Sequence, residues 1–232
     1  MIEDAPLLTV DGLTKWYGRR LGCTNISFDL YEGEVLAIVG ESGSGKSTLL
    51  QLLSGQLQPN DGRILYRMRD ETVADLWHLS EPMRRLLFRT DWGYVHQDAQ
   101  MGLRMGISAG GNVGERLMAV GWRNYGAIRD TATDWLARVE IDQARIDDTP
   151  RTYSGGMRQR LQIARNLVTA PRLVFMDEPT GGLDVSVQAR LLDLLRRLVS
   201  DLNIAAIVVT HDLAVARLLS TRIMVMKAGE VI

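Results

Sequence analysis

Uninterrupted apolar runs mark out the strand-like segments of this chain. Residues 35–39, 173–176 and 204–209 are apolar throughout, and each run ends in glycine or in polar residues. Runs of this length suit parallel strands that are covered on both faces. Residues 187–202 instead place apolar side chains at helical spacing, with Asp184 or Ser186 as the expected N-cap. The alternation of strands and helices predicts an α/β fold.

Two segments depart from that pattern. Residues 7–29 alternate more and carry turn residues at Asp11-Gly12 and Tyr17-Gly18, which predicts antiparallel β-structure. The stretch from about 98 to 160 opens with glycine-rich residues 101–114 and continues with helical patterns over 113–120 and 125–139. We interpret it as a helical subdomain inserted in the α/β core. The expected architecture is one domain over residues 1–232, with a mixed or parallel sheet core and an N-terminal antiparallel β subdomain.

Charge and composition exclude several classes of protein. The 27 basic and 28 acidic residues give a net charge of −1, which argues against a general nucleic-acid or membrane-surface binder. The single cysteine, Cys23, cannot form an internal disulfide and fits a reducing cytosol as a small packed hydrophobe. Residues 1–6 lack the features of a secretory signal, and no apolar run approaches the ~18 residues of a membrane span. We expect a cytoplasmic chain whose membrane role, if any, comes through a partner.

A phosphate-binding loop follows the first buried run. Its residues match the P-loop pattern between a predicted strand and a predicted helix: Gly40-Glu41-Ser42-Gly43-Ser44-Gly45-Lys46-Ser47. Glycines let the backbone amides turn toward phosphate oxygens, and the helix N-terminus adds favourable partial charge. Lys46 is expected to reach the β- and γ-phosphates, and the Ser47 hydroxyl, with Thr48 beside it, to bind Mg²⁺. The pattern predicts a nucleotide site.

Two other segments carry candidate chemistry. Asp177 and Glu178 end the run 173–176, where Asp177 can hold Mg²⁺ and Glu178 can activate a water molecule. A pair of acids without a catalytic role is the alternative, which the upstream P-loop makes the weaker one. Ser154-Gly155-Gly156, followed by Met157, precedes a predicted helix over 161–168, and taken alone it indicates an ordinary capped helix.

Together these motifs resemble the ATP-binding-cassette (ABC) ATPases, over essentially the whole chain. In that family two cassettes pair head to tail, and the signature segment of one closes over the ATP held by the other. The resemblance implies a homodimer with composite sites for ATP and Mg²⁺, in which Ser154, Gly155, Gly156 and Met157 face the partner's nucleotide. It also implies four further roles. Tyr17 or its neighbour Trp16 would stack on adenine, and Gln97 would bind Mg²⁺ and sense the γ-phosphate. His211 would contact the γ-phosphate and hold the attacking water, and Asp184 would link the two sites.

Each of these roles has a plainer alternative. Tyr17 could be a core aromatic, Gln97 a surface amide and His211 a helix cap, while His78 and His96 match no motif. The sequence also departs from the common family pattern, with Tyr153 and Met157 where leucine and glutamine are usual and with Gly181-Gly182 before Leu183. Many relatives continue with a further helix beyond the last predicted strand, so a shortened chain and a naturally short tail both fit.

Residues 184–189 resemble two groups of cassettes, namely the ATPase subunits of oligopeptide, dipeptide and nickel importers and the cassette subunit of the bacterial carbon–phosphorus lyase system. Residues 95–97, 102–104, 108–119 and 145–148 favour the second group, which implies a soluble lyase core as partner and residues 102–116 as the contact segment. Three functions stay open: a soluble ATPase that remodels the lyase core, the subunit of an importer with a membrane permease, and a nucleotide-dependent clamp with little turnover. A DNA-repair cassette is a distant fourth, because the charge is balanced and paired cysteines are absent from the sequence.

Overall fold

The computed structural model describes residues 5–232. The expectation that residues 1–6 form no secretory signal falls mostly on residues 1–4, which lie outside the described residues. Two compact units share the chain: one comprises the residues up to Leu86 together with Asn203–Ile232, and the other Leu87–Leu202. Among the described helices none is long and apolar enough to cross a membrane.

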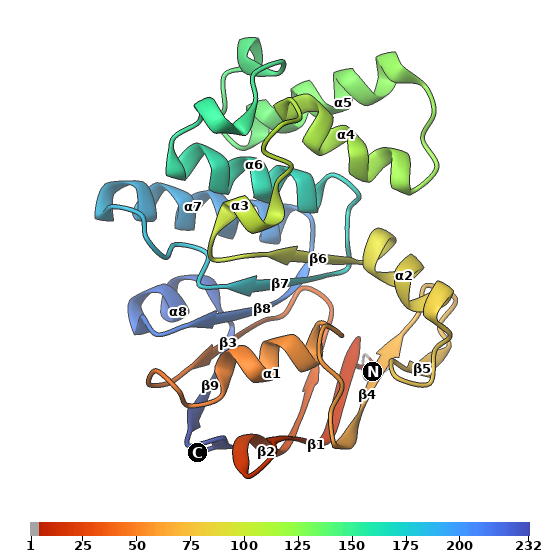
Figure 1. Cartoon of the computed structure of the whole chain (residues 1–232), viewed down its shortest axis with the longest axis vertical. Helices are drawn as coiled ribbons and strands as arrows, with labels where there is room; N and C mark the ends of the chain where they lie inside the picture. Colours follow the sequence, from red (N-terminus) through yellow and green to blue (C-terminus); the bar gives the residue numbers. More distant parts are fainter. Residues whose placement is uncertain (1–4) are drawn as a thin grey trace. The chain divides into compact units, whose positions relative to one another are not determined.

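The first unit contains the predicted antiparallel sheet. Its strands run in the order β2-β1-β4-β5, with bounds β1 Leu8–Tyr17, β2 Arg20–Leu30, β4 Asp61–Arg67 and β5 Val73–Asp75 (Figure 1). β1 and β2 pair from Leu8 opposite Leu30 to Tyr17 opposite Arg20. Gly18, with φ of 60°, supplies the left-handed turn between them. The antiparallel expectation for residues 7–29 is confirmed.

The same unit holds three parallel strands. β3 (Val35–Val39) pairs with β8 (Ala205–Thr210) on one side and with β9 (Arg222–Lys227) on the other. The short strand β10 (Glu230–Val231) pairs with β9 in the antiparallel direction. All residues of β3 and β8 are buried, as continuous apolar runs predict. Two helices follow these strands, α1 (Lys46–Leu53) after β3 and α8 (Leu213–Leu219) after β8. The boundary between the two units falls within α2 (Glu81–Thr90), after Leu86.

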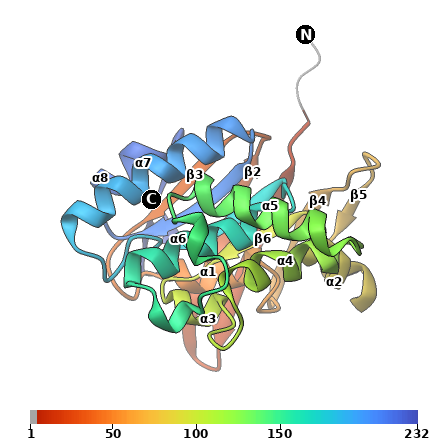
Figure 2. The same ribbon diagram turned by 90° about the horizontal axis from the view of Figure 1, so that it is seen from above.

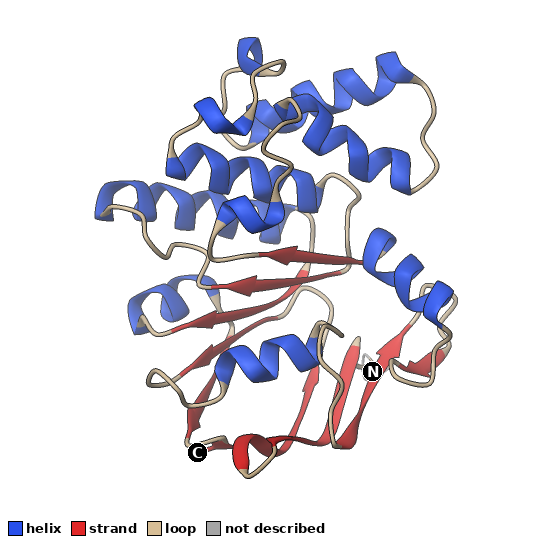
Figure 3. Ribbon diagram, in the orientation of Figure 1, coloured by secondary structure: helices blue, strands red, loops and turns tan. Residues whose placement is uncertain are grey.

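The second unit is mostly helical (Figure 3). Its strands β6 (Trp92–Val95) and β7 (Leu173–Asp177) are parallel. Its helices are α3 (Ala99–Gly102), α4 (Ala109–Ala119), α5 (Tyr125–Arg138), α6 (Gly155–Leu167) and α7 (Val185–Asp201), with 3₁₀ turns at Gln143–Arg145 and Pro150–Thr152. Asp184, and not Ser186, caps α7, since its Oδ1 accepts from the N–H of Val187 at 3.1 Å.

α4 begins earlier than the sequence predicts. Its helical pattern was expected over 113–120, after a glycine-rich segment, but the helix starts at Ala109, where the Ser108 hydroxyl accepts from Gly111 N. Two of its glycines are packing residues: a Cβ on Gly110 would lie 2.6 Å from Ile146 Cγ1, and one on Gly114 2.7 Å from Ile128 Cγ2. Ile128 belongs to α5, and Figures 1 and 2 show α4 and α5 side by side. The glycines therefore let α4 approach its neighbours closely.

Candidate nucleotide-binding site

The P-loop connects β3 to α1 as its pattern requires. Gly40 and Gly45 have φ of 155° and 103°, and a Cβ on either would collide with backbone oxygen, of Met226 and Gly22 respectively. Only glycine fits at these two positions. No side chain caps α1, since its N-cap is Gly45 itself. The first amides of the helix are therefore left for an anionic ligand.

Lys46 folds back over its own loop. The side chain is 7% exposed, and Nζ donates to the carbonyl oxygens of Gly40 at 2.8 Å and Glu41 at 2.9 Å. An ammonium group has three donors, so one remains for a phosphate oxygen. The loop also holds a buried hydroxyl, Ser44 Oγ, which has no hydrogen-bond partner within residues 5–232. The loop is thus rich in donors and is lined with glycine.

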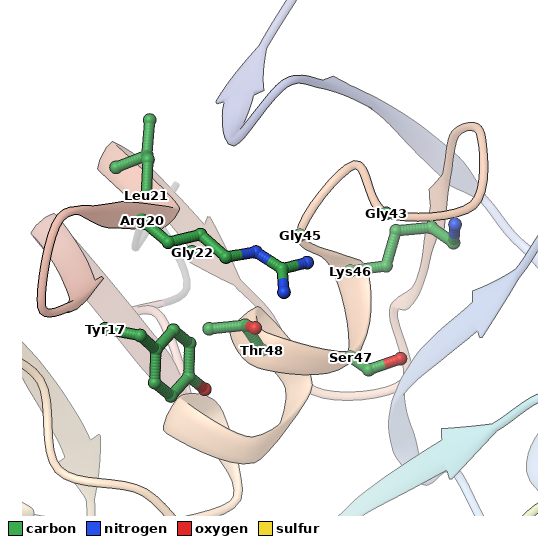
Figure 4. Close-up of a pocket in the computed structure, with 9 residues that line it drawn as sticks. All are labelled: Tyr17, Arg20, Leu21, Gly22, Gly43, Gly45, Lys46, Ser47 and Thr48. Carbon is green, nitrogen blue, oxygen red and sulfur yellow. The ribbon is translucent and has the colours of Figure 1, made fainter.

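An open pocket of about 460 Å³ lies beside the loop. In Figure 4, Tyr17 and Thr48 lie on one side of the start of α1, and the side chains of Lys46 and Ser47 lie on the other. Tyr17 is 45% exposed, so it is not a core aromatic, and unlike Trp16 it lines the pocket. A Cβ on Gly22 would lie 2.9 Å from Thr48 Cγ2 and 3.1 Å from Tyr17 Cε2. Gly22 therefore makes room for the tyrosine ring.

His211 lies at the same edge of the parallel strands as the P-loop. The register pairs Val39 with Thr210, so the residues that follow them, Gly40 and His211, leave neighbouring strand ends. The helix cap at this point is Asp212, whose Oδ1 accepts from Ala214 N at 2.7 Å. The imidazole of His211 is therefore not the cap of α8, and it is exposed.

Gln97, Asp177 and Glu178 come together in the second unit. Val95 pairs with Met176, which places Gln97 and the acidic pair at adjacent parallel strand ends, with Asp177 as the last residue of β7. Glu178 has φ of 43°, a left-handed conformation that costs a non-glycine residue about 1 kcal/mol or more and is frequent at functional sites. The Glu178 carbonyl accepts from Gly181 N at 2.8 Å, and a Cβ on Gly181 would lie 3.0 Å from Gln97 Nε2. The side chain of Gln97 thus lies against the turn that follows Glu178.

The segment Ser154–Met157 begins α6. Ser154 Oγ accepts from Met157 N at 3.3 Å, which is the predicted cap. A Cβ on Gly156 would lie 2.7 Å from Val187 Cγ1 of α7, so packing within the chain already requires this glycine. Gly155 has more space, since a Cβ there would lie 3.5 Å from Leu183 Cδ2, an ordinary van der Waals contact. Gly155 and Leu183 line a second pocket of about 320 Å³ together with Gln97 and Arg158.

The two unusual residues around this segment share one partner, Arg145. The Tyr153 hydroxyl donates to the Arg145 carbonyl at 2.8 Å, and the Arg145 guanidinium carbon lies 4.6 Å from the centre of the Tyr153 ring. Nη1 of the same arginine lies 3.5 Å from Met157 Sδ, and its Nε pairs with Asp148 at 2.7 Å. The side chains of Tyr153 and Met157 therefore both contact Arg145.

Three side-chain amides of α6 are buried and hydrogen-bonded, a role that the sequence motifs do not indicate. Gln162 Oε1 accepts from His96 N at 2.7 Å, and Gln162 Nε2 donates to the His96 carbonyl at 3.1 Å. Gln159 Nε2 donates to the same carbonyl at 3.2 Å, and Asn166 Oδ1 accepts from Tyr94 N at 3.0 Å. The available signal was a row of amides at positions i, i+3 and i+7, facing an otherwise apolar core. Two of these amides join α6 to His96, the residue immediately before Gln97, and the third joins it to Tyr94.

Asp184 has a structural role besides any role in a dimer. Its Oδ1 accepts from the Ser186 hydroxyl at 2.8 Å as well as from Val187 N. The hydrogen bond from Ser186, followed by the one from the Val187 amide, lowers the pKa of the Asp184 carboxyl. Asp184 is thus held ionised at the start of α7.

These geometries define a P-loop nucleotide-binding domain, with a phosphate loop between buried strand and helix and with carboxylates at the end of a second parallel strand. The family model described as ABC transporter matches residues 23–181, and the chain belongs to this family. It is an ATPase of the ABC type.

Three relatives show where the chain lies within the family. PhnK of Escherichia coli (strain K12), provisionally described as a phosphonates utilization ATP-binding protein, is 63% identical over 227 residues, which are 98% of this chain and 88% of that protein. The dipeptide transport ATP-binding protein DppD of Bacillus subtilis (strain 168) is 36% identical over 94% of this chain, and the match spans 65% of DppD. Among solved structures, the ATP-binding cassette MJ0796, a dimer in a post-hydrolysis state with ADP and Pi, has a TM-score of 0.84 and 29% identity, covering 97% of this chain and 96% of its own.

Proposed function

We propose that this chain is the ATP-hydrolysing cassette of a phosphonate utilization system and that it acts on a soluble carbon–phosphorus lyase core. The observation that carries the proposal is the 63% identity to E. coli PhnK, which extends over 98% of the chain. The match to dipeptide transport protein DppD is 36% identical. A cassette for a membrane permease is therefore the second candidate.

The proposed cycle begins when two copies of the chain close head to tail on ATP. The solved cassette MJ0796 is dimeric with ADP and Pi, which supports this arrangement. Tyr17 stacks on adenine, and residues 40–48 bind the phosphates through Lys46 and the loop amides. Ser154, Gly155, Gly156 and Met157 of one copy face the nucleotide of the other, and Asp184 lies between the two sites. ATP favours the closed state because only that state contacts it from both chains.

Hydrolysis then reopens the pair. Glu178 accepts the proton of the attacking water, and His211 and Gln97 contact the γ-phosphate side. The oxygen donors of Ser47, Gln97 and Asp177 suit Mg²⁺, which takes few protein ligands and completes its shell with water and phosphate oxygens. When bound there, the ion would neutralise charge on the β- and γ-phosphates. Opening and closing would in turn open the lyase core for substrate entry, product exit or repair of its cofactor.

The proposed contact with the core is the segment 102–116. Asn112, which is fully buried, fixes its shape: Oδ1 accepts from Arg104 N at 2.8 Å, and Nδ2 donates to the carbonyls of Arg104 and Ile107 at 3.0 Å. Glu115 ties the segment to α6 through an ion pair with Arg165 at 3.0 Å. Ile107, 39% exposed, offers an apolar side chain on this hydrogen-bonded segment.

The test is affinity purification of the tagged chain from phosphate-starved source cells, followed by native mass spectrometry with and without ATP. We expect a complex with soluble lyase subunits. Ile107→Asp should lose that complex and keep its ATPase activity, whereas the matched substitution Val73→Asp, at an exposed position in the other unit, should keep both. Recovery with an integral membrane permease would instead make the chain an importer subunit. A chain that binds ATP without steady-state turnover would be a clamp.

A further inference from the structure

Arg20 is a pocket residue to which the motifs assign no role. It is the first residue of β2 and lies opposite Tyr17 in the strand register. Figure 4 shows its side chain extended into the pocket, with the guanidinium between the Tyr17 ring and the loop at Gly45. The side chain is not used for local pairing, because it has no hydrogen bond or ion pair with any other described residue. By contrast, Arg63 in the same sheet pairs with Asp11 at 2.7 Å.

The charge of the pocket points to an anionic ligand at this position. Its nine lining residues include two cations, Arg20 and Lys46, and no carboxylate. The two cations approach from opposite sides of the first turn of α1, Lys46 beside the P-loop and Arg20 beside the aromatic ring (Figure 4). A nucleotide with its base at Tyr17 would run its phosphates from Arg20 toward Lys46. A planar guanidinium binds phosphate oxygens through paired N–H donors, and it keeps its charge at every relevant pH.

The geometry points to Arg20 as a binding residue for the phosphates nearest the ribose, in a role that rests on the P-loop assignment. These phosphates are present in both ATP and ADP. Arg20 therefore stabilises the substrate, the transition state and the product to similar degrees. Such uniform binding changes KM and the affinity for ADP and leaves kcat unchanged.

The experiment compares Arg20→Gln with Arg19→Gln, because Arg19 is the exposed neighbouring arginine in the same turn and does not line the pocket. Dissociation constants for ADP and for a non-hydrolysable ATP analogue are measured by titration calorimetry, with tripolyphosphate as a competitor that lacks ribose and base. We expect Arg20→Gln to weaken both nucleotides and tripolyphosphate roughly tenfold, the size typical of a charge-assisted hydrogen bond. KM should rise by a similar factor at unchanged kcat, Arg20→Lys should recover part of the loss, and Arg19→Gln should stay within about twofold of the wild type.

Several results would overturn the proposal. Unchanged constants in Arg20→Gln, or an equal loss in Arg19→Gln, would remove the specific contact. A loss confined to the ATP analogue would place Arg20 at the γ-phosphate, and a loss for nucleotides but not for tripolyphosphate would place it at the ribose or base. Lys46→Ala serves as the reference for the P-loop: if it binds ADP normally, the P-loop assignment itself fails, and this failure can be distinguished from that of Arg20.

Discussion

The side-chain amide of Gln162 pairs with both backbone groups of His96, accepting from its N–H at 2.7 Å and donating to its carbonyl at 3.1 Å. Gln162 lies on the helix that begins at the Ser154–Met157 segment, and His96 immediately precedes Gln97. The side-chain amide thus satisfies the backbone N–H and carbonyl of His96, as a neighbouring strand would in a sheet. The consequence is that α6 and the base of the Gln97 loop are held as one piece.

Gln162→Leu tests this pairing. Leucine has a similar volume and no polar group, so the N–H of the half-buried His96 loses its partner. We expect the free energy of unfolding to fall by about 1–3 kcal/mol, the cost of a largely desolvated donor that loses its acceptor. Chemical denaturation of the variant is compared with that of Gln51→Leu, an exposed glutamine on α1, which should change little. Equal stability of the two variants would show that the amide pairing contributes nothing.

Lys46→Ala removes the cation from the P-loop. We expect the affinity for ATP to fall by about 100-fold or more, because a charge-assisted contact to phosphate is lost. Lys46 also braces the loop through the carbonyls of Gly40 and Glu41, so circular dichroism is needed to confirm the fold. An unchanged dissociation constant in a folded variant would rule out the loop as the phosphate site.

Tyr153→Phe removes one hydroxyl and keeps the ring against Arg145. The Arg145 carbonyl loses its donor, and we expect a loss of about 1 kcal/mol in stability. For a chain of this size, that corresponds to a Tm lower by roughly 2–4 °C. The control is Tyr31→Phe, since Tyr31 is 40% exposed. A Tm equal to that of the wild type would mean that water replaces the hydroxyl at no cost.

Cys23 makes stability depend on pH in the alkaline range. Burial of the thiol raises its pKa from 9.0 to about 11, because the thiolate is poorly solvated in the core. The unfolded chain therefore loses this proton at lower pH than the folded one. The contribution to stability is present below about pH 9 and is lost as the pH rises toward 11. Denaturation at a series of pH values should show a steeper decline for the wild type than for Cys23→Ala, and parallel curves would contradict the assignment.

The sequence predicts those parts of the molecule in which local pattern and burial agree. Residues of β3 and β8 are buried on both faces, so an uninterrupted apolar run was enough, and Asp184 could be proposed as a cap from its position before an apolar helical pattern. The start of α4 could not be predicted, since its glycines are explained only by Ile146 and Ile128 across the packing. The pairing of the α6 amides and the position of Arg20 in the pocket depend likewise on how distant segments of the chain pack together. For the candidate site, the motifs supplied the residues, and the structure adds their placement within each unit. β3 and β8 bring the P-loop and His211 to neighbouring strand ends, and β6 and β7 do the same for Gln97 and the acidic pair.

Closure of two copies on ATP is the central claim, and Glu178→Gln tests it most directly. The variant keeps the nucleotide ligands and loses the group that activates water, so ATP should bind and persist. Light scattering after size exclusion should give double the 25.9 kDa of the single chain with ATP and the single mass without it. Adding Ser154→Arg, which puts a bulky side chain where the partner's nucleotide would lie, should abolish that dimer without weakening ATP binding to the monomer. A Glu178→Gln chain that binds ATP and remains monomeric would contradict the composite site.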